Sequence, residues 1–190
     1  MMIRSGLKNN TGGFTLIELI VAVAVFTVVM TFSTSSILSI FDSNRKAQSL
    51  RSVMDNMNLT FESMTRTIRF GGTYHCDVTQ GSLAATRDCA SGATSMSVIG
   101  SDGVTVLFRL NNSKIERSIN GGTTWTQFTS SDVTVTKLTF YVLGSTNYSG
   151  GDFLQPRVIV VVGGYSGLKP TSRSTFTLQT TISQRNIDSQ

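Results

Sequence analysis

The chain has 190 residues, of which 39% are hydrophobic and 14% charged, and its formal net charge is +5. This length suits one globular domain with an appended helix. The 16 basic residues are scattered, with no run longer than Arg45-Lys46, so the electrostatic footprint of a nucleic-acid-binding protein is absent and nucleic acid is not an expected partner.

The first segment, residues 1–13, is polar and carries Arg4 and Lys8 with no acidic residue beside them. An apolar run follows from Phe14 to Phe32, in which Glu18 is the only charged residue. A helix of this length spans roughly 28 Å, close to the thickness of a bilayer's hydrocarbon core. Because a basic flank stays on the cytoplasmic side, we expect a single-pass inner-membrane protein whose chain after about residue 35 lies outside the cytoplasm.

The helix is expected to continue to Phe70, since no glycine or proline occurs between Phe14 and Phe70 and Gly71-Gly72 then provides a stop. We assign residues 14–36 to a membrane and assembly half and residues 37–70 to an amphipathic half. Asp42-Ser43-Asn44 leaves a break in the helix open. The predicted buried stripe of the second half is Leu50, Met54, Met57, Phe61, Met64 and Ile68.

After Gly72 the hydrophobic period changes from near 3.6 to 2, which predicts a β-rich head over residues 71–190. Alternation is clear at Val104–Leu110 and Phe176–Ile182, and a change of phase near Thr136-Lys137 predicts a bulge. Asn111-Asn112 and Asn120-Gly121-Gly122 are predicted turns. The fold class is therefore α+β, with a long N-terminal helix packed on an antiparallel sheet.

Two further expectations concern less regular parts of the head. The continuous apolar run Val158–Val162 predicts a strand buried on both faces. Residues 73–95 show no clear period and are expected to form a loop region.

The chain has two cysteines, Cys76 and Cys89, and one histidine, His75. In an exported domain a disulfide between the cysteines is favoured over two free thiols, and closing this loop would contribute about 3 kcal/mol in the chain-entropy description. With no CxxC pair, His75 is interpreted as a loop residue rather than a metal ligand. No Walker A, GxGxxG or HExxH motif occurs, so no metal, cofactor or catalytic residue is expected and an enzyme ranks last among the function classes.

Three interpretations compete for residues 1–32. A cleaved secretory signal needs a small-x-small site after the apolar run, and Ala22-Val23-Ala24 lies in the middle of that run. A plain signal anchor gives no reason for Glu18, which costs about 2.5–3.5 kcal/mol at the centre of a spanning helix and less near its end.

The third interpretation is a resemblance. The stretch GGFTLIEL, from Gly12 to Leu19, resembles the class III signal of type IV pilins and type II secretion pseudopilins. The resemblance implies cleavage between Gly13 and Phe14 by a prepilin peptidase, N-methylation of Phe14, and a role for Glu18 in charge pairing with the N-terminal amine of a neighbouring subunit. The alternative for Glu18 is that it lies near the headgroups and reaches the interface.

The resemblance also narrows the type of subunit. Many major pilins carry glycine and proline within this helix, where the present chain has Thr27 and Ser35. That difference favours a minor pilin or minor pseudopilin, and the Thr175–Asn186 segment is similar to the end of W-type minor pilins and J-type minor pseudopilins.

The expected function is co-assembly in the initiation or at the tip of a type IV pilus or secretion pseudopilus. The expected partners are the peptidase, other subunits, an inner-membrane assembly platform and membrane lipid. The alternative is a membrane-anchored adhesin or DNA-uptake module displayed on a pilus.

Overall fold

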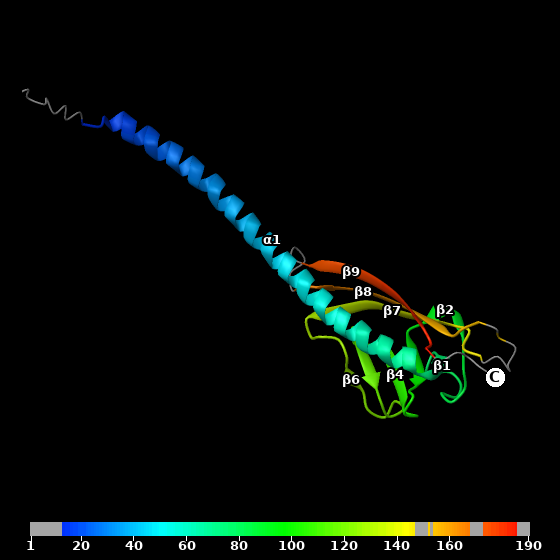
Figure 1. Cartoon of the computed structure of the whole chain (residues 1–190). Coiled ribbons are helices and arrows are strands. Elements are labelled where there is room, and N and C mark those ends of the chain that lie inside the picture. The colour runs from blue at the N-terminus through cyan, green and yellow to red at the C-terminus, as the bar shows by residue number, and fades with distance from the viewer. Residues whose placement is uncertain (1–12, 147–151, 153, 168–172, 186–190) are drawn as a thin grey trace, which may run out of the picture. The chain divides into compact units, whose positions relative to one another are not determined.

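A computed structural model describes residues 13–146, 152, 154–167 and 173–185 (Figure 1). The chain divides into two compact units, one ending at Asn44 and one from Arg45 to the C-terminus. We call the first the amino-terminal unit and the second the head, and describe each by itself.

Helix α1 extends from Leu16 to Phe70, and its helical hydrogen-bonding pattern continues through residues 42–44. The expected long helix is confirmed, and the break left open by the sequence is absent. At its C-terminus the Gly71 N–H donates to the carbonyl oxygen of Thr67 at 3.1 Å. The Tyr74 hydroxyl lies 2.8 Å from the carbonyl oxygen of Ile68, so a side chain from the first strand satisfies a helix-end carbonyl. Gly71 is required here because a Cβ would lie 2.4 Å from a methyl group of Val98.

The head contains two antiparallel sheets, which confirms the α+β class. The first has the order β1-β3-β4-β5-β6, formed by Gly72–Cys76, Ser95–Ile99, Thr105–Asn111, Lys114–Ser118 and Thr126–Gln127. The second has the order β2-β7-β8-β9, formed by Cys89–Ala93, Val133–Leu143, Arg157–Ser166 and Ser174–Ser183. Both sheets contribute to one core with the second half of α1.

The helix buries a different stripe from the predicted one. Its buried residues are Val53, Met57, Thr60, Met64 and Ile68, whereas Leu50 and Met54 are 39% and 36% exposed. At 100° per residue the buried arc is rotated by about 40° from the predicted centre. Thr60 tolerates burial because its hydroxyl lies 2.9 Å from the carbonyl oxygen of Asn56 and 3.3 Å from that of Phe128.

Two local β predictions are confirmed, and a third is displaced by one residue. The turn predicted at Asn111-Asn112 lies at Asn112 and Ser113, which have φ of 46° and 58° and connect β4 to β5 as a two-residue hairpin turn, while Asn111 is the last residue of β4. Gly121 and Gly122 have φ of 68° and 94° in the predicted second turn. The register between β7 and β8 shifts between Val135 and Lys137, at the expected bulge.

One prediction about the head is only partly right and another is wrong. Residues 77–88 form the expected loop between β1 and β2, but the rest of 73–95 holds most of β1, all of β2 and the start of β3, and irregular register in β1 and β2 hides their period of two. In β8 only one face is fully buried, through Val158, Val160 and Val162, while Ile159 and Val161 are half-buried. Val158, Val160 and Val162 belong to the core that the helix and both sheets share.

Candidate functional site

The amino-terminal unit begins its helix at a capping residue. The N–H of Glu18 donates to the hydroxyl oxygen of Thr15 at 3.3 Å, and the N–H of Leu19 donates to the Thr15 carbonyl at 3.2 Å. Thr15 therefore caps α1, and Glu18 takes the third helical position, the spacing of a capping box. A carboxylate in the first turn is also favoured by the positive end of the helix dipole. The sequence contained this signal in Thr15-Leu16-Ile17-Glu18, and motif comparison alone passed over it.

The apolar side chains of this unit are uncovered. Phe14 is 86% exposed, and the large apolar residues from Leu16 to Phe41 are about half exposed or more. The helix segment is long and apolar enough to cross a membrane. Fully burying one such side chain is worth about 1.5–3 kcal/mol, so this surface requires an apolar environment outside the described chain.

Glu18 lies within one apolar face of the helix. Phe14, Glu18, Ala22 and Phe26 follow one another at steps of four residues, which places them in a row. Together with Leu19 and Val23 they line a shallow hollow. If a neighbouring helix covers this face, the carboxylate is removed from water, and a cation must then meet it at close range.

Hydroxyl side chains between Thr27 and Ser36 satisfy themselves within the helix. The Thr27 hydroxyl donates to the carbonyl of Val23 at 2.8 Å, and Thr31 repeats the pattern with Thr27 at 2.8 Å. Residues 33–36 each bond the carbonyl four residues earlier in the same way. The only polar side-chain donors of this stretch are therefore paired, which lowers their cost in an apolar environment.

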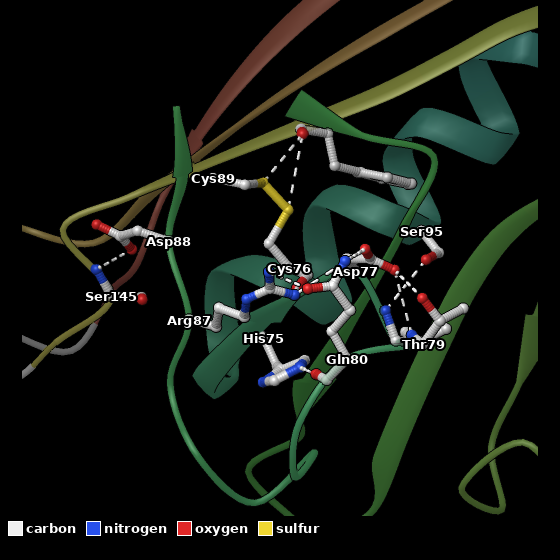
Figure 2. Close-up of a disulfide and its surroundings, with 12 residues drawn as sticks. His75, Cys76, Asp77, Thr79, Gln80, Arg87, Asp88, Cys89, Ser95 and Ser145 are labelled. Atoms are coloured by element: carbon white, nitrogen blue, oxygen red, sulfur yellow. Dashed lines mark hydrogen bonds and ion pairs between the residues drawn. A yellow bond between two sulfur atoms is a disulfide. The ribbon is translucent and has the colours of Figure 1, made fainter. Parts of the chain in front are cut away.

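The head contains the second predicted feature, the Cys76–Cys89 disulfide, and the structure confirms it (Figure 2). Cys76 belongs to β1 and Cys89 to β2, so the bond joins the edge strands of two different sheets, with the Cα atoms 5.9 Å apart. Both sulfurs lie near the carbonyl oxygen of Phe140 on β7. The bond is thus a structural link at the border of the two sheets.

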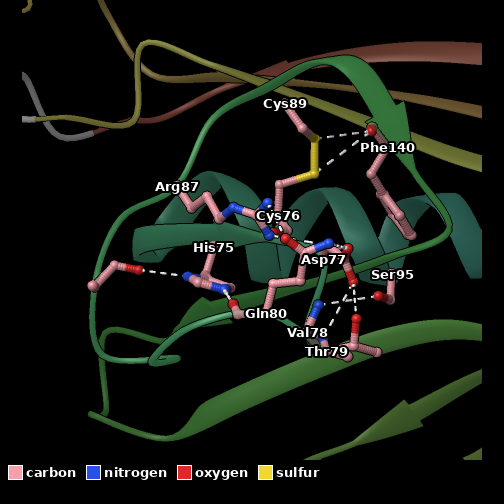
Figure 3. A network of polar contacts seen from close by, with 11 residues as sticks. His75, Cys76, Asp77, Val78, Thr79, Gln80, Arg87, Cys89, Ser95 and Phe140 are labelled. Carbon is pink, nitrogen blue, oxygen red and sulfur yellow. Dashed lines mark hydrogen bonds and ion pairs between the residues drawn. A yellow bond between two sulfur atoms is a disulfide. The ribbon is translucent and has the colours of Figure 1, made fainter.

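A polar network orders the segment between the cysteines (Figure 3). The carboxylate of Asp77 accepts from the hydroxyl of Thr79 at 2.7 Å and the side chain of Gln80 at 2.8 Å, and the Arg87 guanidinium lies 4.0 Å away. These hydrogen bonds, those from Thr79 first, lower the pKa of Asp77. The composition of the network is that of side chains that hold a loop in place, and not that of a reactive centre.

His75 lies in β1 and is buried, not in a loop as expected. Its Nδ1 lies 2.8 Å from the carbonyl oxygen of Ala85 and its Nε2 2.5 Å from that of Gln80. Both ring nitrogens are thus directed at backbone carbonyls. Among the residues that the structure describes, no group of three or more His, Cys, Asp or Glu side chains is placed to hold a metal ion.

The predicted site residues fall into two groups. Gly13, Phe14 and Glu18 lie together at the start of α1, and the two cysteines lie in the head. Gly12, the basic flank with Arg4 and Lys8, and Asn186 lie outside the described residues.

Comparison with known proteins identifies the first group. The prokaryotic N-terminal methylation motif matches residues 8–34. The chain therefore carries the class III signal of type IV pilins and pseudopilins, which supports the role of a pilin or pseudopilin subunit. No curated protein and no solved structure matches the chain.

Proposed function

We propose that the chain is a minor pilin or minor pseudopilin, a structural subunit that co-assembles through α1 into a type IV pilus or a type II secretion pseudopilus. The observation that supports this most is the uncovered apolar half of α1, which begins inside a methylation motif. A head with its own core on the other half of the helix suits a subunit whose helix is buried in an assembly while its head stays outside.

The first step of the proposed function is the removal of the leader peptide. A prepilin peptidase cuts between Gly13 and Phe14 on the cytoplasmic face, removes the leader with Arg4 and Lys8, and leaves the apolar helix in the inner membrane. Phe14 then carries a new, methylated amine. Gly13 lies outside the helix, and a Cβ on it would meet no atom within 4 Å, so nothing in the described fold requires glycine there. Recognition by the peptidase is the reason for a glycine at position 13.

Assembly then gives Glu18 a partner. Its carboxylate lies on the face that Phe14 and Ala22 share, so packing a second helix on that face buries the charge. The amine of a neighbouring Phe14 is a cation that the same chemistry supplies to every subunit. Pairing the two fixes the axial position of one helix relative to the next, because leaving either charge unpaired in an apolar environment costs several kcal/mol, on the order of 3–5.

The absence of helix breakers in α1 supports a minor rather than a major subunit. Thr27 and Ser35 stand where many major pilins have helix breakers, and α1 is helical without interruption. The head would lie in the periplasm or at the cell surface, with the inner-membrane platform and other subunits as partners. Initiation or the tip is the proposed position.

Cleavage tests the processing step. Co-expression of the full chain with a prepilin peptidase should shorten it at the Gly13–Phe14 bond, as intact-mass measurement would show, and Gly13→Val should block this. Thr11→Val, in the same leader, serves as the control and should be cut as usual. A Gly13→Val chain that is cut at the same bond would contradict the assignment.

Paired variants at Glu18 separate charge pairing from helix capping. Glu18→Gln keeps the capping-box residue type and removes the charge, whereas Glu18→Val removes both. If charge pairing sets assembly, both variants should insert in the membrane and both should fail to enter filaments, as scored in sheared filament fractions. Normal assembly of Glu18→Gln would overturn the pairing and leave Glu18 with only its local role.

A further inference from the structure

Strand β9 is the border strand of the second sheet. It pairs with β8 along its full length, Ser174–Ser183, and no other strand pairs with it among the described residues (Figure 1). The ten-residue strand is long for a border strand, and the register with β8 shows no bulge.

The backbone groups that point outward can be assigned. The Gln184 N–H donates to the Pro156 carbonyl at 3.0 Å, so this pair is hydrogen-bonded, and the pairing of Ile182 with Val158 continues the same alternation. In an antiparallel ladder the N–H and C=O of one residue point to the same side, and successive residues alternate. The residues that direct both groups to the free edge are therefore Thr175, Thr177, Gln179, Thr181 and Ser183.

These outward groups have no hydrogen-bond partner within the described chain. The next residue of the same alternation, Arg185, donates its N–H to the carbonyl of Arg69 at 2.8 Å, where the end of α1 reaches the strand. At the other end the hydroxyl of Ser174 donates to the carbonyl of Lys46 at 3.2 Å. Between these two contacts, no hydrogen bond joins the edge to another residue that the structure describes.

The strand lacks the features that usually protect an open edge. Natural sheets blunt such edges with charged side chains, proline, bulges or very short strands. The sequence of β9, STFTLQTTIS, contains no charge, proline or glycine. By contrast, the border strand β6 of the other sheet has only two residues. A long, regular and uncharged edge is a surface suited to pairing with another strand.

The charges at the two ends of β9 indicate which kind of strand would pair with its free edge. Arg173 and Arg185 flank β9, twelve residues apart, with their guanidinium groups 4.3 Å from the Tyr165 ring centre and 5.1 Å from that of Phe70. Neither forms an ion pair with a described residue. A second copy of β9 would bring arginine against arginine in either direction, which disfavours self-pairing. An acidic residue at each end of the incoming strand would be attracted instead.

We propose that the free edge of β9 binds an extended segment of a partner protein by strand addition. The segment has an uncharged, β-prone centre with a carboxylate near each end. Main-chain hydrogen bonds supply the affinity, and the two arginines supply the selection and the register. The inference concerns the head alone and does not depend on the function proposed for the amino-terminal unit.

Peptide binding to the full chain in detergent micelles tests the proposal. The probe is a synthetic peptide of alternating threonine and valine with an aspartate at each end, and the matched control peptide has lysine at those ends. At low ionic strength the acidic peptide should bind about tenfold more tightly, as measured by calorimetry, since two exposed ion pairs replace two repulsive ones.

Two protein variants locate the binding. Gln179→Pro removes an outward N–H without breaking a bond to β8, and proline is tolerated at such edge positions. It should reduce binding at least tenfold, whereas Gln179→Ala, which keeps the N–H, should bind as the wild type does. An unchanged thermal unfolding curve shows that the proline variant is folded. If it is not folded, hydrogen exchange of the outward backbone amides of β9 in the wild-type protein, with and without the acidic peptide, gives a second readout.

Three outcomes would overturn the proposal. These are equal binding of the two peptides, equal binding by the proline and alanine variants, and no added protection in the complex of the five outward amides, those of Thr175, Thr177, Gln179, Thr181 and Ser183. A dimer of the unliganded chain that Gln179→Pro dissociates would replace the acidic partner with a second copy.

Discussion

At the scale of single residues, the network around Asp77 shows how a small number of polar contacts orders the segment that the disulfide closes. The Asp77 carboxylate is the common acceptor, while the Arg87 guanidinium lies 3.1 Å from the carbonyl oxygen of Cys76. Because the contacts are hydrogen bonds to the ionised form, they stabilise the charged carboxylate and lower its pKa.

Asp77 should contribute stability near neutral pH and lose it in acid. Its pKa in the folded chain lies below the ordinary value of 3.8, so its contribution is present above that value and disappears as the pH falls through the lowered pKa. Asp77→Asn keeps an acceptor for the Thr79 N–H but removes the charge. The variant should unfold at a slightly lower temperature than the wild type near pH 7, and the two midpoints should converge well below pH 3.8. A constant difference at both pH values would contradict this origin.

Sequence reasoning worked best where a residue's role depends on its chain neighbours. Glu18 was identified because the motif around it is contiguous, and the disulfide because only two cysteines were available. His75 was misplaced because its burial depends on Gln80 and Ala85 folding back over β1. That return of the chain follows from the sheet pairing and the disulfide, which hydrophobic periodicity does not encode.

At the scale of elements, the rotated stripe of α1 shows what tertiary contacts add. Apolar periodicity gave the helix and its bounds, because no glycine or proline interrupts it. It did not give the centre of the buried arc, since Leu50 and Met54 are as apolar as Val53. Packing against the two sheets buries Val53. It also buries the polar Thr60, whose hydroxyl is hydrogen-bonded to the carbonyl oxygen of Phe128.

Two methionines on this helix provide a matched test. Met57 is fully buried and Met54 is 36% exposed. Met57→Ala should lower the free energy of unfolding by about 2–5 kcal/mol, because it leaves a cavity in the core. Met54→Ala makes the same chemical change near the edge of the stripe and should cost less than half as much. Chemical denaturation of both variants gives the comparison, and equal losses would show that Met54 is buried as fully as Met57, as in the predicted stripe.

The disulfide acts between elements. It connects β1 and β2, the edge strands of separate sheets, and β1 contributes to the core through Tyr74. Replacing Cys76 and Cys89 together by serine should lower the free energy of unfolding by about 3 kcal/mol, from the lost restriction on the unfolded chain. Denaturation of the double variant measures this loss. Reduction of the wild-type chain should reproduce it, and a stability unchanged by either treatment would mean that the bond places no constraint on the unfolded chain.

At the scale of the whole molecule, the two units differ in where their apolar side chains lie. Every fully buried apolar side chain of the described core lies between Val53 and Ile182, inside the head. The amino-terminal unit contributes none, and its large side chains are exposed. One unit is therefore stabilised from within, and the other requires a membrane or neighbouring helices, which suits a subunit that passes from a bilayer into a filament.

This division predicts that the head folds without the amino-terminal unit. The fragment 45–190 keeps the core, both sheets and the disulfide, and omits the exposed apolar run that ends at Phe41. It should be soluble without detergent and monomeric by light scattering. Its unfolding midpoint should match that of the head in the full chain in micelles, because no core contact is lost. The full chain without detergent should aggregate through its exposed helix. A fragment that is unfolded, while the full chain in micelles is folded, would show that the amino-terminal unit contributes to the stability of the head.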